Sequence, residues 1–303
     1  MVQIKRVLCP VDFSEASRHA IEHALVIARW YKASITALHV YNPLFMPVPG
    51  LPAPDDRVPD VELKRVGAET AACFAGPASD GVSVDVLVDV GQPARHILDR
   101  AAALDADVVV MGTHGASGFE HLVLGSVTEK VLRKAPCPVL TVPPRAQATS
   151  ELPFRRLLCA VDFSASSLAA LDLAFSLAQE SDAALTMVHV IEWPWEEPPP
   201  PVLQELPPEQ AVALTEYRRY VEKSAMDRLK ALVPDRLGDR CATSTQVVHG
   251  KSYVEILRIA AEGSADLIVM GVHGRNAADL MLFGSTTNHV VRRATCPVLT
   301  LRH

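Results

Sequence analysis

The sequence predicts an α/β protein built from two copies of one domain, in which parallel strands are joined by crossover helices. Three observations predict it: a length of 303 residues, an internal repeat, and short apolar runs that alternate with helical patterns. A prior of roughly 100–200 residues per domain gives about two domains. Each half, roughly 150 residues long, is large enough to bury its own hydrophobic core.

The repeat is visible as matched segments at two offsets. LCPVDFSEAS at 8–17 matches LCAVDFSASS at 158–167, an offset of 150 residues. DVVVMGTHG at 107–115 matches DLIVMGVHG at 266–274, an offset of 159. The second copy therefore holds a net insertion of nine residues, which we place in the proline-rich stretch WPWEEPPPPVLQELPPE.

A polar, proline-flanked stretch separates the two copies and sets the predicted boundaries. We predict domain one at 1–144, a linker at 145–153 and domain two at 154–303. A solenoid needs shorter units and at least three of them, so the pattern indicates a duplicated domain.

The first half of each copy is predicted as strand, helix, strand, helix, strand. In copy one, IKRVLCPV at 4–11 is a continuous apolar run, which suits a strand buried on both faces. Ser14 then suits the N-cap of a helix. SITALHV at 34–40 is the second strand, and after a proline-rich loop and a helix, SVDVLVDV at 83–90 is the third.

The second half continues the alternation. Pro93 can open a helix, because its missing N–H costs nothing in the first turn. DADVVVMG at 105–112 and CPVLTV at 137–142 are the last two strands, and SVTEKVLRKA at 126–135 is the helix between them. Crossover helices imply a parallel sheet covered on both faces. Ligands of such sheets bind beyond the carboxyl ends of the strands, at a topological switch point.

Composition excludes several function classes. With 29 Lys and Arg against 35 Asp and Glu, the formal charge of −6 argues against an electrostatic nucleic-acid binder. No apolar run reaches 18 residues, so no membrane span is expected. The start, MVQIKRVLCPVDFS, has no signal-peptide pattern, so we expect a cytoplasmic protein.

The six cysteines are too few for a disulfide scaffold of this length, and none forms CxxC. Cys9, Cys137, Cys159 and Cys296 lie in apolar, strand-like runs. We expect them to be buried small hydrophobes in a reducing compartment.

Candidate ligand-binding residues follow the predicted strands in both copies. Asp12 and Asp162 come directly after the first strand, and the spacing G-x2-G-x9-G-S begins at Gly112 and at Gly271. Glycines let backbone N–H groups approach an anion, and a helix start adds further N–H groups and a positive dipole end. A carboxylate at the neighbouring strand end can accept hydrogen bonds from a nucleoside. The pattern predicts a nucleotide site in each copy.

The same glycines also have a purely structural interpretation. A glycine after a parallel strand often forms a tight turn, and Gly125-Ser126 can be a helix entry with Ser126 as the N-cap. Short glycine motifs also match by chance. The residues alone leave both interpretations open.

At these motifs the chain resembles the universal stress protein family in its tandem form. The resemblance is carried by VDFS at 11–14 and 161–164, by the glycine spacing, and by CPVLT at 137–141 and 296–300. It implies two Rossmann-like doubly wound domains, each a five-stranded parallel sheet in the order 3-2-1-4-5 with helices on both faces. It also implies ATP binding, because members that keep the glycine motif typically bind ATP.

Carried over position by position, the resemblance implies one adenine nucleotide in each copy. The aspartate would contact the nucleoside, the strand-two valine the adenine, the Met-Gly pair the ribose, and the glycine loop and helix start the phosphates. The loop histidine lies near the ribose or phosphate, or is only a loop residue with a backbone hydrogen bond. In copy one the implied residues are Asp12, Val40, Met111, Gly112, His114, Gly115, Gly125, Ser126 and Val127. In copy two they are Asp162, Val190, Met270, Gly271, His273, Gly274, Gly284, Ser285 and Thr286.

The resemblance implies a nucleotide-dependent sensor or regulator in a stress response, with ATP, with or without Mg²⁺, as cofactor and cyclic AMP as a variant. The sequence lacks a P-loop, a paired carboxylate cluster and a nucleophile elbow, which favours a non-enzyme. Two alternatives stay open: a slow ATP hydrolase or phosphoryl transferase, and an interaction or chaperone-like protein in which nucleotide is incidental.

The C-terminal strands CPVLTV and CPVLTL carry an expectation about assembly. The resemblance implies that they pair the two halves as an intramolecular pseudo-dimer, with a homodimer of chains and an unknown protein partner as further expectations. Trp193 and Trp195 lie in the proline-rich stretch of copy two, as a partner-binding element or as a loop packed on its own domain.

Overall fold

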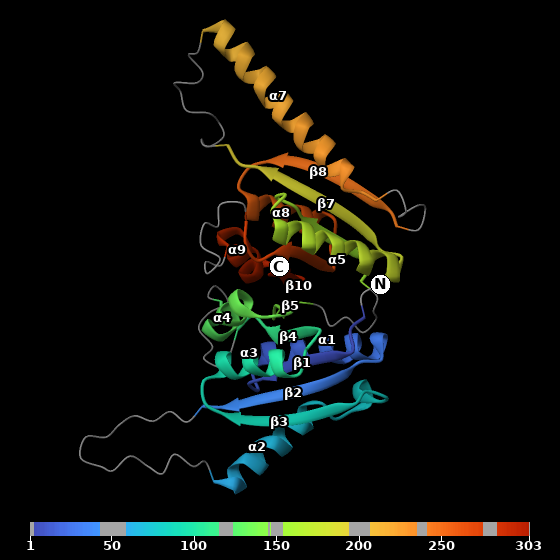
Figure 1. The fold of residues 1–303 in the computed structure, drawn as a ribbon, viewed down its shortest axis with the longest axis vertical. Helices are drawn as coiled ribbons and strands as arrows, with labels where there is room; N and C mark the ends of the chain where they lie inside the picture. Colours follow the sequence, from blue (N-terminus) through green and yellow to red (C-terminus); the bar gives the residue numbers. More distant parts are fainter. Residues whose placement is uncertain are drawn as a thin grey trace, which may run out of the picture. The chain divides into compact units, whose positions relative to one another are not determined.

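The computed structural model describes residues 3–42, 59–114, 124–144, 146, 154–193, 207–234, 241–274 and 284–302. The chain divides into two compact units (Figure 1). One unit joins Gln3–Leu152 with Thr295–Arg302, and the other comprises Pro153–Ala294.

The first repeat alternates strands and helices as predicted. Its strands are β1 (Arg6–Val11), β2 (Ser34–Tyr41), β3 (Val84–Val90), β4 (Val108–Gly112) and β5 (Val139–Val142). Its helices are α1 (Glu15–Tyr31), α2 (Asp60–Cys73), the 3₁₀ helix η1 (Pro77–Ser79), α3 (Pro93–Ala103) and α4 (Ser126–Lys134). Pro93 is in the first turn of α3, as the sequence predicts, and Arg133 and Lys134 are in the last turn of α4.

The second repeat has the same alternation. Its strands are β6 (Arg156–Ala160), β7 (Ala184–Ile191), β8 (Thr243–His249), β9 (Leu267–Gly271) and β10 (Val298–Leu301). Its helices are α5 (Ala165–Ser181), α7 (Pro208–Ala231), α8 (Ser252–Glu262) and α9 (Ser285–Arg293).

Strand order confirms the predicted fold class. In the first repeat the order is β3-β2-β1-β4-β5 and all four pairings are parallel, which is the order 3-2-1-4-5. In the second repeat β8-β7-β6-β9 pair in the same way. Right-handed crossovers place α1 and α2 on one face of the first sheet and α3 and α4 on the other. Central strands are buried on both faces, and Leu8 and Val109 are each 0% exposed.

The last strand of the chain is grouped with the first repeat. β10 pairs antiparallel with β5, with Val298 opposite Thr141 and Thr300 opposite Val139. The hydroxyl of Thr141 donates to the Val298 carbonyl oxygen at 3.1 Å, and that of Thr300 donates to the Val139 carbonyl oxygen at 3.3 Å. The unit built on the first repeat therefore ends in an antiparallel strand beyond its five parallel ones.

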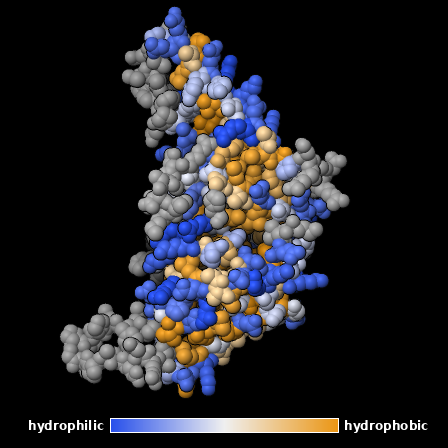
Figure 2. All heavy atoms as spheres, viewed as in Figure 1, coloured by the Kyte–Doolittle hydropathy of each residue, from blue (hydrophilic) through white to orange (hydrophobic). Residues whose placement is uncertain are grey.

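The nine-residue insertion does not lie where we predicted it. α7 is 24 residues long and its counterpart α2 is 14, so the extra length extends a helix rather than the proline-rich loop. Figure 1 shows α7, in orange, running past the end of β8. The projecting half exposes apolar residues among polar ones (Figure 2); Val212 and Tyr217 are each 57% exposed. The sequence AVALTEYRRYV propagates a helix well, whereas prolines mark only where it starts.

Two further features concern the apolar content of the helices and the state of the cysteines. Across the described residues, no helix combines the length and the apolar content that crossing a bilayer requires. All six cysteines lie in described segments, and no disulfide joins any two of them. Cys9, Cys159 and Cys296 are buried as predicted, and Cys137 is half-buried.

Candidate functional site

The carboxyl ends of β1 and β4 meet at one edge of the first sheet. The two strands are parallel neighbours, with Val7 opposite Val108. Asp12 follows β1 directly and Gly112 ends β4, so the predicted acidic residue and glycine motif lie at the same edge. In the second repeat the glycine motif lies directly against the carboxylate, because a Cβ placed on Gly274 would lie 2.9 Å from the Oδ2 atom of Asp162. This edge is the topological switch point of the fold.

A tight turn orients each of these carboxylates. Oδ1 of Asp12 accepts hydrogen bonds from the backbone N–H of Ser14 at 3.1 Å and from its hydroxyl at 2.6 Å. Phe13, between them, adopts a left-handed backbone with φ 64°. Ser14 is the predicted N-cap, and its Oγ accepts from the backbone N–H of Ser17 at 3.1 Å. The turn thus fixes the aspartate and begins α1 at once.

The second copy repeats this turn. Oδ1 of Asp162 accepts from the backbone N–H of Ser164 at 2.9 Å, and Phe163 has φ 63°. Ser164 caps α5 through the backbone N–H of Ser167. The carboxylates of Asp12 and Asp162 are therefore held in the same way.

The histidines of strand two, His39 and His189, make packing and backbone contacts. His39 donates from Nδ1 to the Val11 carbonyl oxygen at 2.8 Å, and its ring stacks on Phe13 with centroids 4.8 Å apart. His189 makes the same bond to Val161 at 2.7 Å. Their neighbours Val40 and Val190 are half-buried near the ends of β2 and β7, at the same sheet edge.

The glycine that ends strand four is required by close packing. A Cβ on Gly112 would lie 2.8 Å from the backbone carbon of Ala16, and one on Gly271 would lie 2.6 Å from the Ser166 hydroxyl oxygen. The start of α1 or α5 thus rests directly on the strand end. This contact supports the structural interpretation of these two glycines in addition to any role at a ligand.

The side chains of the methionines before these glycines are buried rather than exposed at the sheet edge. Met111 is 5% exposed and Met270 is 4% exposed, because both side chains enter the core. A ribose beside either Met-Gly pair would therefore meet mainly backbone.

The helices that follow the glycine loops start without a side-chain cap. The N-cap of α4 is Gly125, with φ −59° and ψ 135°, and Ser126 is the first helical residue. The alternative in which Ser126 caps the helix is therefore wrong. In the second repeat Gly284 is the N-cap and Ser285 the first helical residue. Both helices follow the carboxyl ends of their strands, so the backbone N–H groups of their first turns lie at the edge where an anion is predicted. No side chain caps these groups.

Two threonines hold these helix starts against the strand ends. Thr128 donates from Oγ1 to the Gly112 carbonyl oxygen at 3.0 Å, and Thr287 does the same to Gly271 at 2.9 Å. The sequence analysis missed them. The signal was present, since both copies read G-S-x-T.

The remaining motif residues are partly described. His114 is half-buried with Nδ1 2.8 Å from the Thr113 hydroxyl. His273 is 7% exposed, and its carbonyl oxygen accepts from the Ser166 hydroxyl at 2.5 Å. Val127 and Thr286 occupy the second positions of α4 and α9, and both are half-buried. Gly115 lies outside the described residues.

The structure describes one of the two tryptophans of the proline-rich stretch, Trp193. Its Nε1 donates to Nδ1 of His249 at 2.9 Å, and the Arg218 guanidinium lies 5.3 Å from the centroid of its ring. This residue packs on its own unit. Trp195 lies outside the described residues.

A search of the described segments finds no group of three or more His, Cys, Asp or Glu side chains that could hold a metal ion. The described part of each sheet edge places an oriented carboxylate beside glycine-bounded backbone. Such an arrangement can bind a polar ligand that carries both hydroxyl donors and an anion.

Comparison with known proteins assigns the chain to a family. The model of the universal stress protein family matches residues 3–143 and 153–302, and the chain belongs to that family in tandem form. A universal stress protein of Methanocaldococcus jannaschii is 36% identical over 140 residues, which is 46% of this chain and 81% of the relative. One of Mycobacterium tuberculosis is 26% identical over 302 residues, 98% of this chain and 96% of the relative.

The fold is also that of a solved universal stress protein from Archaeoglobus fulgidus. That structure has a TM-score of 0.66 and 24% identity, and it covers 99% of each chain.

Proposed function

We propose that this protein binds one adenine nucleotide, ATP, in each repeat and acts as a nucleotide-dependent regulator in the cytoplasm. The observation that carries the proposal is the pairing, made twice, of an oriented carboxylate with an uncapped helix start at the switch point. The resemblance to glycine-motif universal stress proteins supports ATP as the nucleotide. The absence of disulfides among the cysteines supports a reducing compartment.

In this proposal, different residues at the sheet edge contact different parts of the nucleotide. Asp12 and Asp162 accept from the nucleoside, and Val40 and Val190 pack on the adenine. The Met111-Gly112 and Met270-Gly271 backbones line the ribose.

The phosphates face the uncapped starts of α4 and α9. In copy one the residues proposed to hold them are Gly115, Gly125, Ser126 and Val127. In copy two they are Gly274, Gly284, Ser285 and Thr286. His114 and His273 flank the phosphates, and Mg²⁺ accompanies ATP only as a phosphate-bound ion.

Regulation rather than turnover follows from the groups at the edge. A single carboxylate, already accepting from its own turn, is poorly suited to activate water. We therefore expect occupancy to alter the order of the neighbouring loops and so the affinity for a protein partner. The pairing of β10 with β5 supports the expectation that the C-terminal strands of the two repeats pair with each other as a pseudo-dimer.

The proposal is tested by releasing nucleotide from the purified protein under denaturing conditions and measuring its amount per chain. The expected result is about two ATP per chain, with calorimetry returning two sites on the stripped protein. The Asp12→Asn and Asp162→Asn variants keep an acceptor for the turn, and each should lose one site. The exposed Asp85→Asn variant, on β3, is the matched control and should keep both.

Other outcomes separate the alternatives. ADP or AMP alone, with turnover lost in the aspartate variants, would favour a slow hydrolase or transferase. Cyclic AMP competing with ATP at both sites would change the nucleotide but keep the site. No bound nucleotide and no heat on adding ATP or cyclic AMP would overturn the site assignment and favour an interaction protein.

A further inference from the structure

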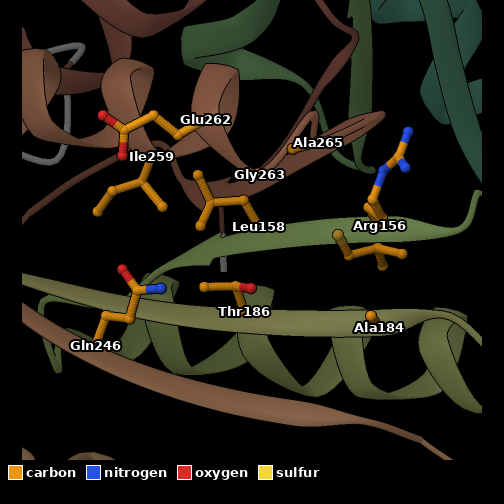
Figure 3. A pocket seen from close by; sticks show the side chains of 10 residues that line it. Arg156, Leu158, Ala184, Thr186, Gln246, Ile259, Glu262, Gly263 and Ala265 are labelled. Atoms are coloured by element: carbon orange, nitrogen blue, oxygen red, sulfur yellow. The ribbon is translucent and has the colours of Figure 1, made fainter.

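The second repeat contains a hollow at the opposite end of its sheet from the glycine loops. Its volume is about 260 Å³, and it lies where β6 and β7 begin, next to the C-terminal end of α8. Figure 3 shows the side chains that line it rising from three neighbouring strands toward that helix end. The residues the argument uses are Arg156, Leu158, Gln246, Ile259, Glu262 and Gly263.

One side chain at this helix end is missing relative to the first repeat. Gly263 is the C-cap of α8, with φ −78° and ψ −2°. Its counterpart Leu104 is the C-cap of α3, with φ −88° and ψ −3°, and both helices have 11 residues. The backbone conformation therefore does not require glycine. Leu104 is half-buried, whereas Gly263 adds no side chain to the lining of the hollow.

The lining of the hollow differs between the repeats at its polar end and at its floor. Gln246 stands at the fourth position of β8, where β3 has Leu87. Glu262 stands at the last position of α8, where α3 has Ala103. Ile259 lies where α3 has an arginine, so the second repeat combines an apolar floor with two polar side chains at one end of the hollow.

The polar groups lie at two ends of an apolar floor. In Figure 3, Arg156 lies to one side of Leu158, and Glu262 and Gln246 lie to the other, with Ile259 beside Leu158. The Nε atom of Arg156 donates to the Ser264 carbonyl oxygen at 2.7 Å, which fixes the base of the guanidinium.

Both ends keep hydrogen-bonding capacity. Among the described residues, no hydrogen bond occupies the two terminal nitrogens of Arg156 or the amide of Gln246. Glu262 places Oε2 2.6 Å from a terminal nitrogen of Arg258. The other carboxylate oxygen of Glu262 is a further hydrogen-bond acceptor at this polar end.

We propose that this hollow binds a small linear ω-amino carboxylate. The ligand carboxylate pairs with the terminal nitrogens of Arg156, a fork that suits two carboxylate oxygens. The ligand ammonium lies at Glu262 and the Gln246 amide oxygen, and the methylene chain lies over Leu158 and Ile259. The volume is just below the roughly 300–1,000 Å³ of sites for drug-sized ligands, which limits the ligand to a small molecule. The proposal does not depend on nucleotide binding.

The test uses 6-aminohexanoate and the full-length chain, with saturation-transfer NMR titrations run with and without ATP. We expect saturable binding that ATP does not displace. Hexanoate and hexylamine each lack one charge and should bind about three- to fivefold more weakly, because the charged ends are solvent-exposed. Glu262→Gln should weaken 6-aminohexanoate by a similar factor and leave hexanoate unchanged.

The two repeats supply the matched variants. Gly263→Leu reproduces the residue of the first repeat and should reduce affinity more than tenfold, with the circular dichroism spectrum and unfolding midpoint showing an intact fold. Leu104→Ala opens space in the first repeat, where the counterparts of Gln246 and Glu262 are apolar, and should leave binding unchanged. The proposal is overturned if 6-aminohexanoate gives no saturable signal, if Gly263→Leu binds as well as the parent chain, or if hexanoate and hexylamine both match it.

Discussion

The hydroxyl of Thr128 donates a hydrogen bond of 3.0 Å to the carbonyl oxygen of Gly112, and this bond joins the first turn of α4 to the end of β4. Thr128 is 3% exposed, so the bond is made away from water. Thr287 and Gly271 repeat the bond in the second copy at 2.9 Å. The position of each proposed phosphate-binding helix start thus depends on one buried threonine.

Removing that hydroxyl should loosen the helix start. We expect Thr128→Val to lower the free energy of unfolding by about 1–2 kcal/mol, because a buried carbonyl loses its partner. Nucleotide affinity of the first site should fall by roughly three- to tenfold, a change of about 0.7–1.4 kcal/mol, while the second site is unaffected. Urea unfolding and two-site calorimetry measure these effects. Thr128→Ser keeps the hydroxyl and should retain most of the stability and most of the nucleotide affinity. Equal losses in the serine and valine variants would contradict the assigned role.

The close contact at Gly112 predicts a contrast between two glycine substitutions. Gly112→Ala puts a Cβ 2.8 Å from Ala16 and should destabilise the chain by about 1–3 kcal/mol. Gly67→Ala in α2 meets no atom closer than 3.6 Å and should stabilise it by roughly 0.5–1 kcal/mol. Chemical denaturation of both variants at one temperature checks the contrast. Equal effects would show that strand end and helix start do not pack as described.

A buried histidine predicts pH-dependent stability near neutrality. His23 is 2% exposed, and burial lowers its pKa below the usual value of a histidine. Its Nδ1 donates to the His19 carbonyl oxygen at 2.8 Å, and its Nε2 is buried with no partner among the described residues. The folded state therefore favours the neutral ring. The stability it contributes is present above about pH 6.5 and is lost as the pH falls toward its lower folded pKa.

The matched variant comes from the other repeat, where Leu173 stands at the equivalent position. We expect the unfolding free energy of the parent chain to fall between pH 7.5 and pH 5, by at most about 1.4 kcal/mol per pH unit from this residue. His23→Leu should flatten that dependence. Denaturant midpoints across the range measure it, and an unchanged slope in the variant would exclude His23 as the cause.

The cysteines should react slowly in the folded state. Burial raises the pKa of the Cys9 and Cys159 thiols far above the usual range and that of Cys137 to about 11. Since the thiolate is the reactive form, little of it exists at pH 7.5. Timed alkylation and mass spectrometry should find these three residues labelled after Cys73, which is half-exposed. Six alkylated residues are expected at once in urea. Early labelling of Cys9 would contradict its burial.

Sequence alone determined the class of the fold and the sheet edge at which the nucleotide site is proposed. A continuous apolar run such as 108–112 is typical of a strand inside a covered sheet, and the matched offsets indicated that one domain pattern occurs twice. Ser14 and Ser164 were predicted as N-caps because capping is local chemistry, set by residues within one turn. The carboxylate and the glycine motif follow strand ends, so topology alone brings them to one edge.

Tertiary structure decided what depends on contacts between distant segments. The insertion proved to be helix because α7 is supported along one part by β8, through contacts such as Thr245 with Met226, which a count of prolines does not reveal. Gly112 needs its glycine because Ala16, 96 positions earlier, rests on it. Likewise, the hollow beside Gly263 is lined by residues of β6, β7, β8 and α8, which only the fold brings together. Local pattern gives each element its type, whereas the space between elements is set by how the whole chain packs.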